Sequence, residues 1–218
     1  KPMKLNRLSD EQMISVKKID ANEKKTVTAL AGLLALTLVF MLGNVSYSYI
    51  QSRESEYSSS TFNTVYGDDQ FSVKLSENAR KDKDIQGENG VTISGSIYSD
   101  ILANNKAMVK VGCIAYTQNG SELSIAKRET IDNVFNGEIK ELRDQSYTVT
   151  ETSRKYDDIT GGLISGFLET SLERSGSQNT LRYYIGTRRN QICMVYVIAP
   201  GNLVDQIYGD VMGTFTIK

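Results

Sequence analysis

The chain has 218 residues, 39% of them hydrophobic and 23% charged, and its 25 basic residues nearly balance its 26 acidic ones. This length fits one or two domains, and a net charge near zero excludes a chain-wide attraction to nucleic acid. Histidine is absent, which excludes the Ser–His–Asp and Cys–His catalytic arrangements and every histidine-ligated metal site.

An uncharged apolar segment, TVTALAGLLALTLVFMLGNVSYSYI, covers residues 26–50. Roughly 20 apolar residues in a helix cross a hydrocarbon layer, and here the apolar side chains lie on every side rather than on one stripe. The segment is longer than the core of an export signal and lacks a good cleavage site. We therefore predict an uncleaved signal-anchor transmembrane helix, bounded by Lys24 and Lys25 at one end and by Tyr47 and Tyr49 at the other.

Basic residues predict the orientation of this helix. Residues 51–75 contain only Arg53 and Lys74, whereas the tail at 1–25 contains Lys1, Lys4, Arg7, Lys17, Lys18, Lys24 and Lys25. Because basic flanks stay in the cytoplasm, we expect a cytoplasmic tail and an extracytoplasmic C-terminal part. The expectation is a single-pass membrane protein whose partners are the lipid bilayer and other membrane protein subunits.

Residues 51–64 are rich in serine and charge, which is typical of a linker, and residues 65–218 have the pattern of a folded domain. Alternating apolar residues predict strands within 71–80, 91–100 and 106–117, with a turn at 119–121. A helical period follows within 123–145, where Ile131, Phe135, Ile139 and Leu142 share one face.

The last third of the chain predicts three strands joined by turns, within 161–173, 179–188 and 190–200. A helix with Leu203, Ile207 and Val211 on one face and Asn202 as its N-cap then leads to a closing strand at 213–218. The strand within 190–200 is apolar on both faces, so both need cover. The predicted fold class is α+β: one N-terminal transmembrane helix, then an α/β/α-type sandwich with a mainly antiparallel sheet.

The domain resembles the PsbP-like superfamily over about residues 62–218. The resemblance lies in the strand exit FSVKLSENAR, the hairpin YYIGTRRNQICMVYVI and the terminal helix followed by MGTFTIK. Ser76 stands where the family motif usually has proline. The resemblance implies an extracytoplasmic α/β/α sandwich that acts as a non-enzymatic accessory domain on a larger membrane complex. It implies no catalytic residues and no cofactor.

Two cysteines, Cys113 and Cys193, lie in predicted strands among apolar neighbours. Outside the cytoplasm they could form a disulfide, but buried free cysteine is common, so two buried thiols are the favoured reading. Two cysteines without histidine predict no metal site.

Positive charge at a predicted hairpin tip makes Arg188, Arg189 and nearby Arg182 candidates for docking to an acidic partner or a lipid headgroup. A solvated turn is the alternative reading. Paired carboxylates at Asp68-Asp69 and Asp157-Asp158 match no calcium-loop spacing, so we expect them in solvated turns.

The sequence thus predicts an accessory or structural subunit of a membrane-anchored complex that is not an enzyme and has no catalytic, cofactor-binding or metal-binding residues. One alternative is a bitopic assembly factor of a secretion or conjugation machine with a cone-shaped α+β domain. The other is a ligand-binding sensor domain, which an apolar cavity would favour.

Overall fold

A computed structural model describes residues 58, 61–82, 91–103, 106–159 and 162–218. The predicted tail (1–25), the predicted transmembrane helix (26–50) and most of the predicted linker (51–64) lie outside these residues, as do Lys24, Lys25, Tyr47 and Tyr49. Neither helix in the described part of the chain is long and apolar enough to cross a membrane.

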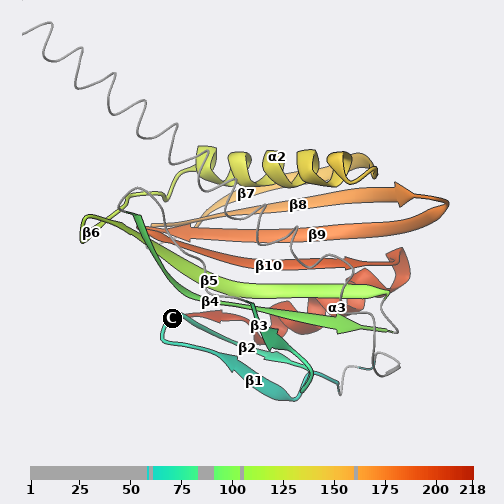
Figure 1. Cartoon of the computed structure of the whole chain (residues 1–218), viewed down its shortest axis with the longest axis horizontal. Helices are drawn as coiled ribbons and strands as arrows, with labels where there is room; N and C mark the ends of the chain where they lie inside the picture. Colours follow the sequence, from blue (N-terminus) through green and yellow to red (C-terminus); the bar gives the residue numbers. More distant parts are fainter. Residues whose placement is uncertain (1–57, 59–60, 83–90, 104–105, 160–161) are drawn as a thin grey trace, which may run out of the picture.

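An eight-stranded antiparallel sheet forms the centre of the described domain (Figure 1). Its strands follow the order β3-β4-β5-β10-β9-β8-β7, and the short β6 pairs with the end of β5. The bounds are β3 Arg80–Lys81, β4 Val91–Leu102, β5 Ala107–Gln118, β6 Ser121–Glu122, β7 Thr148–Ile159, β8 Leu163–Arg174, β9 Ser177–Arg188 and β10 Gln191–Ala199.

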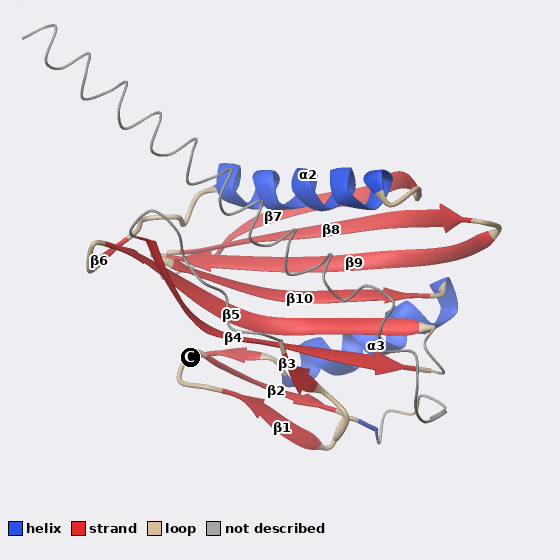
Figure 2. Cartoon of the chain, in the orientation of Figure 1, coloured by secondary structure: helices blue, strands red, loops and turns tan. Residues whose placement is uncertain are grey.

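A second, three-stranded sheet packs on one face of the large one, in the order β1-β2-β11 (Figure 2). It consists of β1 Thr64–Gly67, β2 Phe71–Leu75 and β11 Thr216–Ile217. Phe71, Val73 and Leu75 alternate into the core as the sequence predicted, because successive side chains of a strand point to opposite faces.

Two helices complete the layers. Helix α2 (Arg128–Asp144) covers one face of the large sheet, and α3 (Gly201–Thr214) lies beside the small sheet on the other. The predicted face of α2 is confirmed, since Ile131, Phe135, Ile139 and Leu142 are all buried. The predicted N-cap of α3, Asn202, is wrong: the N-cap is Pro200 and the helix begins at Gly201, two residues earlier than a cap at Asn202 implies.

Helix α2 packs closely against the sheet above a glycine of β8. A Cβ atom at Gly166 would lie 2.5 Å from Ile131 Cγ2 and 3.0 Å from a ring carbon of Phe135. Since real Cβ atoms do not tolerate such distances, the helix can rest at this depth only because β8 has no side chain there.

Strand β10 is buried on both faces, as predicted. Ile192, Met194 and Tyr196 belong to the core under α2, while Cys193, Val195 and Val197 belong to the core under α3 and the small sheet. The domain therefore has two hydrophobic cores, one on each side of the large sheet.

The predicted fold class is wrong. Strands make up 57% of the described residues, against two helices, and the described residues contain no transmembrane helix. One outer layer is a helix, but the other combines α3 with a second sheet, so the layers are not those of an α/β/α sandwich.

Strand β7 was not predicted from the sequence, because strands were recognised by alternating apolar residues. The sequence of β7, TVTETSRKYDDI, is almost entirely polar. As the last strand in the sheet order, β7 has a neighbour on one side only and places few residues in the core. Hydrophobic periodicity is weak in such edge strands.

Candidate functional site

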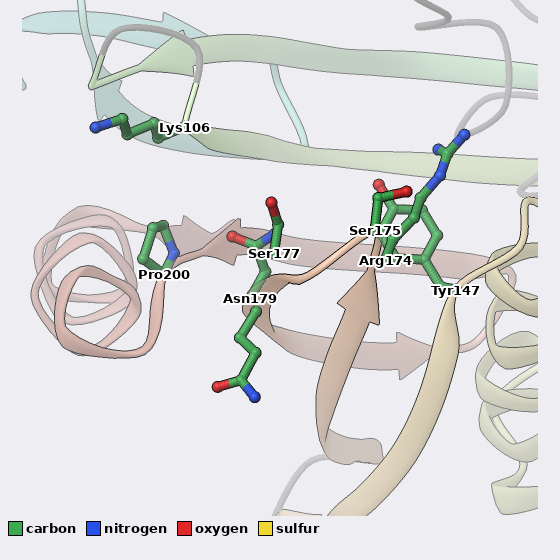
Figure 3. A pocket seen from close by; sticks show the side chains of 8 residues that line it. Lys106, Tyr147, Arg174, Ser175, Ser177, Asn179 and Pro200 are labelled. Atoms are coloured by element: carbon green, nitrogen blue, oxygen red, sulfur yellow. The ribbon is translucent and has the colours of Figure 1, made fainter.

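An open groove of about 640 Å³ lies at the end of the large sheet where β8 ends and β9 begins (Figure 3). Four chain segments that are distant in sequence contribute to it: the start of β5, the segment after α2, the β8–β9 hairpin and the residue before α3. Its lining residues are Lys106, Tyr147, Arg174, Ser175, Ser177, Gln178, Asn179 and Pro200.

The β8–β9 turn shapes one wall of the groove. Arg174 and Ser177 are paired across a two-residue turn in which both Ser175 (φ 52°) and Gly176 (φ 80°) have positive φ. This is the turn geometry that matches the twist of a hairpin. The guanidinium carbon of Arg174 lies 5.1 Å from the centre of the Tyr147 ring, a cation–π contact that orders both side chains.

The charge of the groove is one-sided. Lys106 and Arg174 are its basic residues, and the other lining residues carry hydroxyl, amide or apolar side chains with no carboxylate among them. Such a groove is electrostatically complementary to an anionic partner.

A buried polar cluster lies beneath α2, on the same side of the sheet as Tyr147. Lys110 of β5 and Glu138 of α2 are 0% and 2% exposed. Tyr196 of β10 is the register partner of Lys110 in β5. The hydroxyl of Tyr196 donates a hydrogen bond to Glu138 Oε1 at 2.9 Å. Buried charges of this kind are costly unless they are fully hydrogen-bonded.

The burial of these two groups shifts their titration in opposite directions. Burial raises the pKa of Glu138 to about 7, although the Tyr196 hydroxyl and Lys110 act against the rise. Burial lowers the pKa of Lys110 to about 8, with Asp82 and Glu138 opposing the fall. Desolvation therefore outweighs the attraction between the charges.

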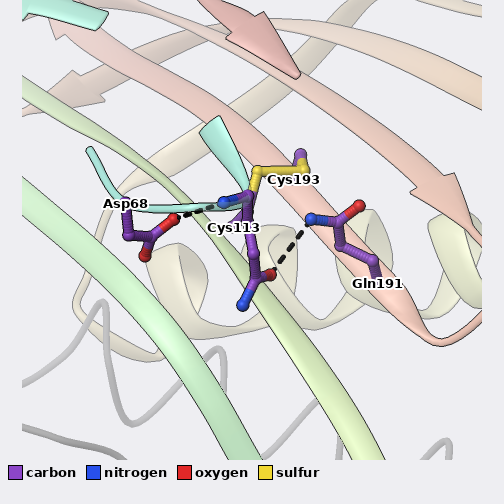
Figure 4. The surroundings of a disulfide bond; sticks show 5 residues. Asp68, Cys113, Gln191 and Cys193 are labelled. Carbon is purple, nitrogen blue, oxygen red and sulfur yellow. Dashed lines mark hydrogen bonds between the residues drawn. A yellow bond between two sulfur atoms is a disulfide. The ribbon is translucent and has the colours of Figure 1, made fainter. Parts of the chain in front are cut away.

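The disulfide lies on the opposite side of the sheet. Cys113 of β5 and Cys193 of β10 are direct partners in the register and are joined, with their Cα atoms 4.0 Å apart. The favoured expectation of two buried thiols is therefore wrong. Figure 4 shows the bond near Asp68, in the turn where Asp68 Oδ1 accepts from the N–H of Gln70; Gln191 donates to the Gln70 side chain.

The predicted docking arginines do not form one patch. Arg182 lies in the middle of β9, where its guanidinium pairs with Glu169 at 2.8 Å and Asp205 at 2.5 Å, linking β8 and β9 to α3. Arg188 and Arg189 are exposed at the β9–β10 turn, at the opposite end of β9 from the groove.

Sequence reasoning missed both the groove and the buried cluster. The groove combines turns that only the folded topology brings together. The cluster did leave a signal, because Lys110 occupies a core-facing position of a predicted strand and Glu138 lies between Phe135 and Ile139 on the predicted apolar face. Within the described ranges, no three His, Cys, Asp or Glu side chains gather as they would around a metal ion.

Solved structures show which fold this is. The solution structure of cyanobacterial PsbP (CyanoP) from Synechocystis matches with a TM-score of 0.51 and 14% identity, over 77% of this chain and 98% of that one. A protein from Bacteroides thetaiotaomicron (TM-score 0.37, 12% identity, 68% of this chain and 45% of that one) and a Pseudomonas aeruginosa protein of unknown function (0.33, 10%, 67% and 88%) score lower.

No family model matches the sequence, and no curated protein is significantly similar to it. The fold assignment rests on the Synechocystis structure, the one neighbour of the three whose match extends over nearly the whole of that protein with a TM-score above one half. The described domain therefore has the fold of that PsbP structure, which supports the resemblance at the level of the fold, although the α/β/α layering expected from it was wrong.

Proposed function

We propose that this protein is a non-enzymatic accessory subunit whose PsbP-like domain docks on a larger membrane complex through the groove at the β8–β9 end of the sheet. The observation that carries the proposal is the charge of that groove, where Lys106 and Arg174 are accompanied by no carboxylate. The PsbP-like fold supports it, since the resemblance to that superfamily implies an accessory role.

We propose further that the domain works outside the cytoplasm. The Cys113–Cys193 disulfide supports this location, because structural disulfides form and persist in oxidising compartments. Quenching cells in acid and alkylating free thiols under denaturing conditions, which exposes the buried cysteines, tests the location by mass spectrometry. We expect both cysteines to escape alkylation; recovery of alkylated Cys113 and Cys193 would place the domain in a reducing compartment.

The docking proposal is tested by purifying the full chain in mild detergent and comparing two charge-reversed double variants. Lys106→Glu with Arg174→Glu reverses the groove, and Arg188→Glu with Arg189→Glu reverses the exposed pair at the other end of β9. Both variants change the same number of charges, so general electrostatic effects are matched. Thermal unfolding shows whether each variant keeps its fold.

We expect membrane subunits to co-purify with the wild type and with the Arg188/Arg189 variant, and to be lost from the groove variant. Loss from the Arg188/Arg189 variant instead would place docking at the predicted arginine turn and overturn the groove assignment. A wild-type chain recovered alone and monomeric would overturn the accessory-subunit proposal.

A further inference from the structure

Helix α2 is held on the sheet by an interface that contains ionisable groups where apolar ones would suffice. Glu138 lies on its buried face, where its carboxyl group accepts a hydrogen bond from Tyr196 and interacts electrostatically with Lys110. Replacing such a buried pair with apolar residues is often neutral or stabilising, so its presence is not explained by a need for packing.

The hydrogen bonding of this interface is incomplete. Glu138 Oε1 accepts a bond from Tyr196, but Glu138 Oε2, Tyr116 Oη and Thr170 Oγ1 are buried and have no hydrogen-bond partner among the described residues. All three lie on the α2 side of the sheet. A buried carboxylate oxygen without a donor strongly favours the neutral, protonated carboxyl group.

We propose that Glu138 is a proton-operated catch: its protonated carboxyl group holds α2 tightly on the sheet, and its ionisation loosens α2 and the groove wall that follows it. The part that concerns the groove rests on the docking function proposed above. The catch itself does not, because it concerns only how α2 is held.

The chain after α2 links the catch to the groove. Helix α2 ends at Asp144, and within three residues the chain reaches Tyr147, whose N–H donates to the Leu142 carbonyl at 3.0 Å. Tyr147 lines the groove and holds Arg174 through the cation–π contact. The Tyr147 phenol also lies near the hydroxyl of Tyr196. Burial and Glu138 contribute more to the raised pKa of the Tyr196 hydroxyl, and Tyr147 adds to it.

Charged and titratable groups face Glu138 from each neighbouring element. Burial is the main cause of its raised pKa, and Glu141 of α2 adds to the rise. Lys110 of β5 and Tyr196 of β10 oppose the rise. Tyr183 of β9 also lies near Glu138, which raises the pKa of the Tyr183 hydroxyl in turn. Strand β8 contributes the uncharged Thr170, and the charged contacts of β7 lie near the start of the helix, where Arg154 and Tyr156 bind Asp132. Asp82, bound to Ser99, faces Lys110.

The sign of the pH effect follows from the direction of the Glu138 shift. The folded chain keeps the Glu138 proton up to about pH 7, whereas an unfolded glutamate loses it near its ordinary pKa of 4.5. The tight state of the interface is therefore complete in acid and is lost as the pH rises through about 7. Lys110 stays charged until about pH 8, so between those values both groups are ionised.

Hydrogen exchange measured by mass spectrometry on the full chain tests the catch without any partner. We expect the protection of α2 amides, corrected for the intrinsic pH dependence of exchange, to fall at least about tenfold between about pH 5.5 and about pH 8. Glu138→Gln, which keeps the Tyr196 bond and cannot ionise, should abolish the fall.

The matched control is Glu129→Gln, an exposed glutamate on the same helix that should leave the fall unchanged. Lys110→Met removes the nearby positive charge, so Glu138 should stay protonated to a higher pH. The pH at which α2 loosens should therefore rise by about one unit. An unchanged fall in Glu138→Gln, or the absence of a fall in the wild type, overturns the proposal. The docking proposal would be unaffected, since no partner enters the measurement.

Discussion

The two faces of the large sheet are built from the same strands but stabilised in different ways. The face under α3 and the small sheet is lined by Val109, Val111, Val195 and Val197 around the disulfide. The face under α2 buries Lys110 and Glu138, and three polar atoms there, Glu138 Oε2 among them, have no hydrogen-bond partner within the described part of the chain. The first is an apolar core with a covalent cross-link, and the second is a core that responds to protons.

One buried carboxylate on each face sharpens the contrast. On the α3 side, Asp100 accepts a bond from the Ser76 N–H at 2.9 Å on one oxygen and from the Ser76 hydroxyl at 2.8 Å on the other. On the α2 side, the described residues offer Glu138 a donor on one oxygen only. Burial raises the pKa of both carboxyl groups, but Ser76 opposes the rise at Asp100 through two hydrogen bonds.

The largest expected effect comes from breaking the cross-link on the α3 side. Cys113→Ala with Cys193→Ala should lower the free energy of unfolding by about 4 kcal/mol, because the disulfide closes a loop of 80 residues in the unfolded chain. Urea denaturation measures the loss. Reductant should destabilise the wild type similarly and leave the double variant unchanged; a variant as stable as the oxidised wild type would contradict this.

Replacing Asp100, whose two carboxylate oxygens both accept hydrogen bonds, should cause the next largest loss of stability. Asp100→Ala leaves the Ser76 N–H and hydroxyl buried without acceptors, so we expect a loss of about 3 kcal/mol in urea denaturation. Asp100→Asn retains an acceptor oxygen and should lose less. Equal losses in the two variants would show that the charge, rather than the hydrogen bonds, stabilises this site.

The α2 face should give the wild type an unusual pH profile. The raised pKa of Glu138 makes the free energy of unfolding fall from about pH 5 to about pH 7, and the lowered pKa of Lys110 makes it rise again above about pH 8. We expect the free energy of unfolding to pass through a trough about 2 kcal/mol deep between about pH 7 and about pH 8, a range in which many domains are most stable. Lys110→Met with Glu138→Gln should remove the trough; its survival would assign it to other groups.

The smallest effects should come from two arginines, one on each face, that form partly exposed ion pairs. Arg182→Met loses the contacts to Glu169 and Asp205, and Arg154→Met loses those to Asp132 and Glu151. Each should lower the free energy of unfolding by about 1 kcal/mol, since solvent screens such pairs. If both variants lose a similarly small free energy of unfolding, the two faces differ in their buried groups and not in their exposed ion pairs. A loss several times larger for one of the two variants would contradict this.

Most elements of the domain could be predicted because their apolar residues follow a clear period. The inward alternation in β2 and the buried stripe of α2 from Ile131 to Leu142 are examples. Strand β7 was missed because an edge strand needs few apolar residues. The separate small sheet was missed because the period of β2 and β11 indicates which residues are buried, but not which sheet they join.

The site was less predictable because it depends on register and topology. Pairing Cys113 with Cys193 requires β5 and β10 to be neighbours, and nothing in either strand alone indicates this. Ser76 is instructive, since proline, which the family motif has here, lacks the N–H that Ser76 donates to Asp100. This departure from the motif has a structural role of its own.

The cross-link joins β5 to β10, where the strands that precede α2 in the chain meet the strands that follow it in the large sheet. A protease that cuts once in the segment between α2 and β7 would therefore produce two pieces that stay tethered. Such a nicked molecule would migrate as one band on a denaturing gel run without reductant and as two bands once reductant is added.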